Sequence, residues 1–96
     1  MIFAYGLTVE VRDAATGRGI AAGSVVVARD GSYSETLVSG PVDSVSVQGA
    51  GERAGTYTII VTRPSYSAWT SPPVTVTADQ CHVHPVLVKA LLAPAP

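Results

Sequence analysis

Apolar and polar residues alternate along much of this sequence, as they do in half-buried β-strands. Leu7, Val9 and Val11 alternate with polar neighbours, and residues 56–62 show the same pattern more clearly. No longer stretch has the apolar period of a helix. The predicted strands are residues 7–12, 24–29, 32–38, 42–47, 56–62, 66–69, 74–77 and 82–92. Seven or eight strands at this spacing predict an all-β sandwich or barrel.

The pattern also predicts how several strands are placed. Tyr57, Ile59 and Val61 share one face of their strand, which is therefore expected to face the core. The unbroken apolar run at residues 25–27 is typical of a strand that is covered on both faces. Residues 42–47 are less regular and are expected to form an edge strand.

Turn residues separate the predicted strands. The Asp13 side chain can accept a hydrogen bond from the backbone N–H two residues later, and Gly17 can take positive φ, so a turn is expected between them. The pair at residues 30–31, Asp-Gly, predicts a hairpin between the second and third strands. The glycine-rich residues 48–55 are expected to form a loop. Pro85 cannot donate to a central ladder, so an unpaired edge or a bulge is expected there.

The composition supports an all-β chain and excludes some functions. Fifteen of the 96 residues are Val, which favours a pleated surface, against five Leu. Net charge is −1, and the few basic residues are spread along the chain, so nucleic-acid binding is not expected. No apolar run is long enough to cross a membrane. Cys81 is the only cysteine, which excludes an internal disulfide.

Four segments carry motifs that occur in this order: "VEVRDAATGRGIAAGSVVV" (9–27), "ERAGTYTIIV" (52–61), "PSYSAW" (64–69) and "VTVTADQCHVHPVLVKALLAP" (74–94). Together they resemble the carboxypeptidase regulatory-like domains, which are transthyretin-like or prealbumin-like sandwiches. The resemblance implies one antiparallel-rich prealbumin-like or Ig-like sandwich at residues 1–96, with a core at about 6–92 and a frayed tail at 93–96.

The resemblance carries two further implications. Ser65 stands where the family usually has glycine, so a positive φ at this position would strain it. Family members are commonly extracytoplasmic, which favours a periplasmic or secreted location by analogy. The first residues do not look like a signal peptide. Either the protein stays in the cytosol or the chain is a mature fragment.

Two groups of residues near the last strand are candidates for chemistry. His82 and His84 would lie on one face of a strand, a spacing seen in zinc sites. The alternative is a pair of histidines that points to solvent at the strand end. Cys81 could be a reactive thiol, although a buried and inert side chain is the expected state.

An aromatic pair and a loop are candidates for binding. Tyr66 and Trp69 could form a platform for a carbohydrate or another small ligand. The alternative, packing of Trp69 over one end of the sandwich, is favoured. Glu52 and Arg53 lie in the predicted loop at 48–55, which could contact a partner or simply connect two strands.

These observations favour a non-catalytic module with a structural or protein-interaction role. No nucleophile pattern is present, so neither catalysis nor a cofactor is expected. Recognition would use loops or an exposed sheet edge, which can add a strand from a protein partner or from a second copy in a homodimer. Arg29, Glu35 or Lys89 would limit unwanted pairing at such an edge. Ligand binding at Tyr66 and Trp69, or metal binding at His82 and His84, remain the alternatives.

Overall fold

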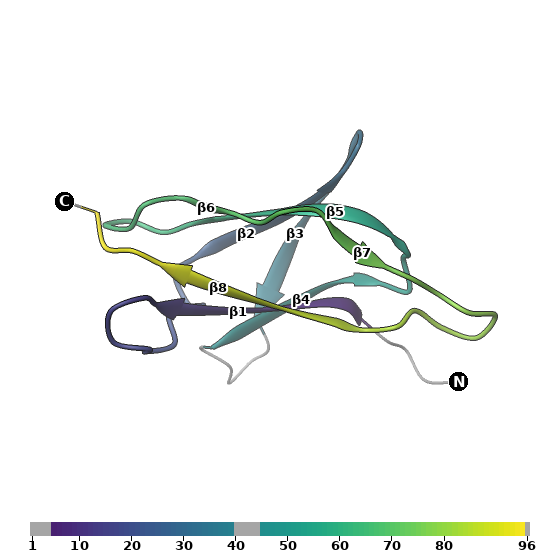
Figure 1. Cartoon of the computed structure of the whole chain (residues 1–96), viewed down its shortest axis with the longest axis horizontal. Coiled ribbons are helices and arrows are strands. Elements are labelled where there is room, and N and C mark those ends of the chain that lie inside the picture. Colours follow the sequence, from purple (N-terminus) through teal and green to yellow (C-terminus); the bar gives the residue numbers. More distant parts are fainter. Residues whose placement is uncertain (1–4, 40–44, 96) are drawn as a thin grey trace.

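The computed structural model describes residues 5–39 and 45–95. The chain is all β, with 61% of its residues in strands, and two sheets pack as the predicted sandwich (Figure 1). No helix that could cross a membrane occurs in the described residues. The strands are β1 (Tyr5–Asp13), β2 (Val25–Asp30), β3 (Tyr33–Ser39), β4 (Ser46–Gly51), β5 (Gly55–Thr62), β6 (Trp69–Thr70), β7 (Val74–Val76) and β8 (Val86–Leu92).

The strands follow one path of hydrogen-bonded neighbours, β6-β5-β2-β3-β4-β1-β8, and β7 also pairs with β5. The path turns from one sheet into the other at β3, which pairs first with β2 and then, at Val38 and Ser39, with β4. β1 and β8 run parallel, and the other strand pairs of the described residues are antiparallel. β8 therefore ends the path on one side, while β6 and β7 end it on the other.

The core lies between the two sheets and uses alternate residues of each strand. Leu7, Val9 and Val11 of β1 are fully buried, and so are Tyr57 and its neighbours on the same face of β5, as the alternation predicted. The other strands and the β1–β2 connection contribute mostly small and branched side chains. These are Ile20, Ala21, Val26, Ala28, Leu37, Val47, Ala50, Val76, Val88, Ala90 and Leu92, and Val83 of the β7–β8 connection is buried with them.

Both turns predicted from local sequence are present. The Asp13 carboxylate accepts the N–H groups of Ala15 at 2.7 Å and Thr16 at 3.0 Å, and Gly17 has a φ of 76°. The β2–β3 hairpin turns through two residues, the first of which is Gly31 with a φ of 59°. Glycine takes this place in a type II′ turn.

The prediction of a loop at residues 48–55 is wrong for the first half of this segment. Residues 48–51 belong to β4, which pairs with both β1 and β3 and is not the predicted edge strand. Gly49 is buried in this strand, and the position requires glycine because a Cβ there would lie 2.5 Å from Cγ of Leu37. The glycine marks a close approach inside a sheet rather than a flexible connection. Residue 42, the start of the predicted strand, lies outside the described residues.

Three other predictions need correction. The run at residues 25–27 is not covered on both faces, because Val25 is 51% exposed while Val26 is buried. The last strand begins at Val86, so Pro85 precedes it. The tail is paired rather than frayed up to residue 95. Ala93 accepts the Ser67 N–H at 2.9 Å, and Ala95 donates its N–H to Ser65 at 2.9 Å.

We predict that Ser65→Gly stabilises the protein. Ser65 has a φ of 70°, the positive value that the family's glycine implied. A side chain costs about 1–2 kcal/mol in this left-handed region, part of which is offset by the greater chain entropy of glycine. Urea unfolding should show a gain of about 1 kcal/mol.

The matched control is Ser67→Gly, two residues further on. Ser67 has no positive φ and donates its N–H to Ala93, so glycine there relieves no strain. This variant should be neutral or destabilised. Equal effects of the two substitutions would contradict the assignment of strain to Ser65.

Candidate functional site

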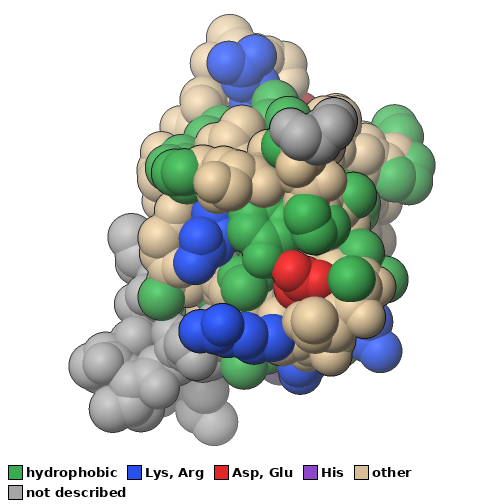
Figure 2. All heavy atoms as spheres, turned by 90° about the vertical axis from the view of Figure 1, so that its left-hand side faces the viewer, with side chains coloured by type: hydrophobic (Ala, Val, Ile, Leu, Met, Phe, Trp, Pro, Cys, Tyr) green, Lys and Arg blue, Asp and Glu red, His purple; other side chains and the backbone are tan. Residues whose placement is uncertain are grey.

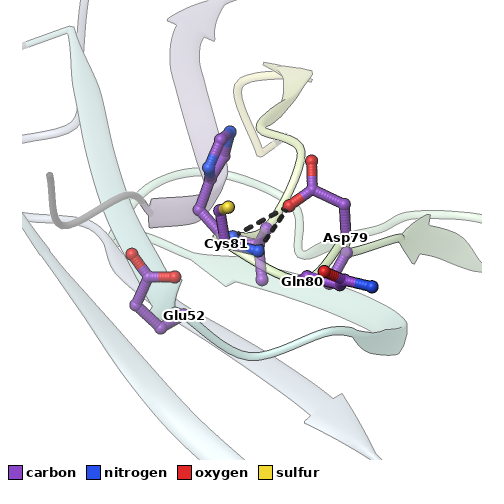
Figure 3. A pocket seen from close by; sticks show the side chains of 7 residues that line it. Glu52, Asp79, Gln80 and Cys81 are labelled. Atoms are coloured by element: carbon purple, nitrogen blue, oxygen red, sulfur yellow. Dashed lines mark hydrogen bonds between the residues drawn. The ribbon is translucent and has the colours of Figure 1, made fainter. Parts of the chain in front are cut away.

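The connection between β7 and β8 is a hairpin-like turn organised by Asp79. One carboxylate oxygen of Asp79 accepts the N–H groups of Cys81 at 2.8 Å and His82 at 3.0 Å (Figure 3). These two bonds, followed by the contact with His84, hold the pKa of Asp79 well below its usual value of 3.8. The turn therefore keeps its shape through a charged carboxylate even though the side chain is exposed.

The two histidines lie in this connection and not on β8. Their ring centroids are 6.1 Å apart. Both ring nitrogens of His84 already have partners: Nε2 lies 3.1 Å from Oδ2 of Asp79, and Nδ1 lies 3.0 Å from Oγ1 of Thr77. The described residues contain no group of three or more His, Cys, Asp or Glu side chains arranged for a metal ion. A metal at this pair would have to displace a contact of His84.

Cys81 is exposed, so the expectation of a buried thiol is wrong. It lines a shallow open hollow of about 210 Å³ together with Glu52, Asp79 and Gln80. Figure 3 shows Glu52 on the opposite side of this hollow from Asp79. The cysteine lies in a connection whose residues 77–82 are all exposed and which projects at one end of the molecule (Figure 1).

The aromatic pair at the other end of the sandwich is held in place by its neighbours. The Tyr66 hydroxyl donates to Oδ2 of Asp13 at 2.6 Å, and the Arg63 guanidinium lies 5.5 Å from the centre of the Tyr66 ring. Tyr66 and Trp69 are both half-buried and pack against the core. The bond to Tyr66 is the main reason why the pKa of Asp13 is lowered, and it raises the pKa of Tyr66 in return.

A further polar cluster, which the sequence did not indicate as a unit, is centred on Arg53. Its guanidinium donates to Asp30 at 3.1 Å and to the Tyr57 hydroxyl at 3.0 Å, and lies 3.6 Å from the centre of the Tyr33 ring. The Tyr57 hydroxyl donates to the Arg53 carbonyl at 2.9 Å. The bonds to Tyr57 and Asp30 raise the pKa of Arg53. Through these contacts Arg53 links the β4–β5 turn to the β2–β3 hairpin.

Glu35 extends this cluster, and its carboxylate is engaged in hydrogen bonds within the chain. It lies in β3 opposite Ala28 of β2, whereas β3 pairs with β4 at Val38 and Ser39, and its carboxylate accepts the Tyr33 hydroxyl at 2.8 Å. The same oxygen accepts the N–H of Ala50 at 3.0 Å. Ala50 has a φ of 52°, an uncommon conformation for alanine. The carboxylate therefore stabilises a distorted part of β4, which indicates a structural role.

The basic side chains form no single patch on the end of the sandwich that includes the C-terminal end of β8. Figure 2 shows Lys and Arg side chains separated by uncharged and hydrophobic ones on this end. Arg12 and Arg63, like Arg53, have intramolecular partners. Arg12 contacts Glu10 at 3.2 Å and donates to the Gly17 carbonyl at 3.0 Å, and Arg63 donates to the Ile20 carbonyl at 3.2 Å.

The backbone of β8 has an open side. Successive residues of a strand direct their N–H and C=O groups to opposite sides. The Leu92 carbonyl accepts the Ala14 N–H at 2.8 Å on the β1 side, while Ala93 and Ala95 bond to residues 65–67 on the other side. The odd-numbered residues of β8 therefore direct their N–H and C=O groups away from β1. No strand among the described residues pairs with β8 on that side.

The same odd-numbered residues expose their side chains. Leu87 and Leu91 are each 53% exposed, and Lys89 lies between them on the outer face. Arg29, by contrast, lies in β2 between two paired strands and cannot guard a sheet edge. Lys89, in contrast, lies on β8, which ends the strand path, and its side chain is exposed. We refer to Leu87, Lys89 and Leu91, with their outward backbone groups, as the open edge.

We predict that Tyr66→Phe raises the pKa of Asp13, because the lost hydroxyl is the largest cause of its lowering. In the native protein the pKa of Asp13 is lower in the folded than in the unfolded chain. Its contribution to stability is therefore complete above about 3.8 and is lost as the pH falls through the folded-state pKa. The variant should lose the share of this acid-sensitive stability that Tyr66 supplies, while the bonds from Ala15 and Thr16 keep the rest, and carboxylate NMR titration and urea unfolding between neutral and acid pH would measure the loss.

Tyr33→Phe is the matched control, since it removes a hydroxyl that is bonded to Glu35 instead. It should leave the pKa of Asp13 unchanged. An unchanged pKa of Asp13 in Tyr66→Phe would show that the backbone N–H groups of the turn, not Tyr66, dominate.

No protein-family model matches the chain, and no curated protein matches it. The resemblance to carboxypeptidase regulatory-like domains therefore stays a prediction based on the four sequence motifs. It agrees with the all-β sandwich and with the positive φ of Ser65.

Proposed function

We propose that this protein is a non-catalytic interaction module that binds a partner by adding a strand to β8. The observation that carries the proposal is the open edge. It offers outward N–H and C=O groups at Leu87, Lys89 and Leu91, with two exposed leucine side chains beside them. Main-chain bonds supply affinity in this mode of recognition, and the alternate side chains supply specificity.

Within the chain itself, residues that follow β8 already form backbone hydrogen bonds on the side that faces away from β1. Ala93 and Ala95 pair with residues 65–67 on the side away from β1. A partner strand at the open edge would extend this pairing toward Val86. The backbone groups of Leu87, Lys89 and Leu91 have the spacing of an ordinary strand, so a partner strand could continue the pairing that Ala93 and Ala95 begin.

The two alternative functions have less support from the contacts. Tyr66 is bonded to Asp13 and lies beside Arg63, so it is not a free stacking surface. Ring nitrogens of His84 contact Asp79 and Thr77. Either alternative would require existing contacts to break, whereas strand addition uses groups that have no strand partner among the described residues.

A second copy of the chain fits the open edge poorly. In the central antiparallel register, Lys89 would face Lys89 of the other copy, and like charges directly opposite are destabilising. Shifting the register one way would require backbone groups of Ala93, which already bond to Ser67. Shifting it the other way would place Leu91 opposite Pro85, which has no N–H. The preferred occupant is therefore another protein.

We predict that Lys89→Pro is tolerated and that Ala90→Pro is not. The N–H of Lys89 points to the open side, whereas that of Ala90 lies in the ladder with β1. Ala90→Pro should therefore cost about 1 to 3 kcal/mol more in free energy of unfolding, because a β1 acceptor loses its partner. Urea unfolding compares the two variants. If both were equally destabilised, the assigned direction of the β8 backbone groups would be wrong.

We predict that Lys89→Leu causes the protein to associate with itself. The substitution removes the like-charge contact of the central register and gives the open edge three neighbouring leucines. Sedimentation velocity should detect dimers of Lys89→Leu at concentrations where the native protein is monomeric. The Arg29→Leu variant, which changes a charge on a paired strand, is the control and should stay monomeric. A monomeric Lys89→Leu protein would contradict strand addition at β8.

A further inference from the structure

The open edge has a defined order of side chains on its outer face. Leu87, Lys89 and Leu91 follow one another at alternate positions, giving an apolar, basic and apolar sequence. In an antiparallel added strand, the residues that exchange backbone bonds with these three would also place their side chains directly beside them. The open edge would therefore contact the side chains of three partner residues, each two positions apart in the partner sequence.

Lys89 has no carboxylate partner within 4.0 Å in the described part of the chain. Its neighbour in the ladder is Glu10 of β1, which is opposite in charge. The Glu10 carboxylate, however, contacts Nε of Arg12 at 3.2 Å. The charge of Glu10 is thus shared with Arg12, and the lysine side chain, which is exposed, is available to a group on its other side.

We infer that the occupant of the open edge is an extended segment of another protein in which apolar, acidic and apolar residues alternate. This inference rests on the function proposed above and adds the chemistry of the partner. An aspartate or glutamate opposite Lys89 would form a cross-strand pair of opposite charge. Apolar residues opposite Leu87 and Leu91 would cover the two leucines, which are each 53% exposed.

Other strands that could occupy the open edge lack either the acidic residue opposite Lys89 or a partner for the lysine charge. A strand with a central basic residue would repeat the repulsion that disfavours a second copy. A strand that is apolar throughout would bury the lysine amine against hydrocarbon without a partner for its charge. Specificity at this edge therefore comes from rejection of wrong strands as well as attraction of the right one.

The test uses two capped synthetic peptides, Thr-Leu-Thr-Glu-Thr-Leu-Thr and the same sequence with Lys in place of Glu. Each is titrated into the ¹⁵N-labelled full chain while amide shifts and hydrogen exchange are followed by NMR. The Glu peptide should protect the outward N–H groups of Leu87, Lys89 and Leu91, and should bind about fivefold more tightly than the Lys peptide at low salt. Lys89→Glu should reverse the preference.

Arg29→Glu is the matched control, because it makes the same change of charge on an exposed residue of a strand that is paired on both sides. It should keep the preference for the Glu peptide. If both peptides protected β8 equally in the native protein, strand addition would stand and the acidic preference would fall. If neither peptide protected any β8 amide, both the preference and the proposed function would be overturned.

Discussion

The parallel ladder between β1 and β8 is the constraint on which the rest of the sandwich depends. It joins a strand near the start of the sequence to one near its end, with a register that runs from Leu7 opposite Val86 to Asp13 opposite Leu92. β1 has β4 on its other side, so its backbone is used in both directions. The ladder brings alternate residues of β8 over the core and leaves the opposite side of that strand without a strand partner.

Strands with one buried face could be predicted from the sequence. In β1 and β5 the alternation of apolar and polar residues follows directly from which side chains reach the core, so the pattern and the burial agree. The β2–β3 hairpin was also predictable, because its signal is the adjacent pair Asp30-Gly31 and Gly31 takes the positive φ of the turn. Each of these features is determined within a few residues of chain.

β4 and the polar cluster could not be predicted, because both depend on residues from different parts of the chain. Gly49 pairs with Leu7 in a strand and must be glycine because Leu37 leaves no room for a side chain, and Ala50 keeps its positive φ beside a carboxylate from β3. Arg53 meets Asp30 only after the two turns have come together. Glycine and charge in the sequence indicated a loop, whereas the tertiary contacts make the first half of it a strand.

The candidate site was predictable only in part, for the same reason. Lys89 was recognised as a charge that could guard an edge, but the side of β8 that is open follows from the register with β1 and from the bonds of Ala93 and Ala95. These bonds also change the role that is expected of Lys89. On a strand with free backbone groups on one side, a charge between two exposed leucines repels an identical strand. The same charge attracts a strand that carries the opposite charge. A single residue can therefore protect the edge from self-association and select its partner, because both effects are the same electrostatic interaction with opposite sign.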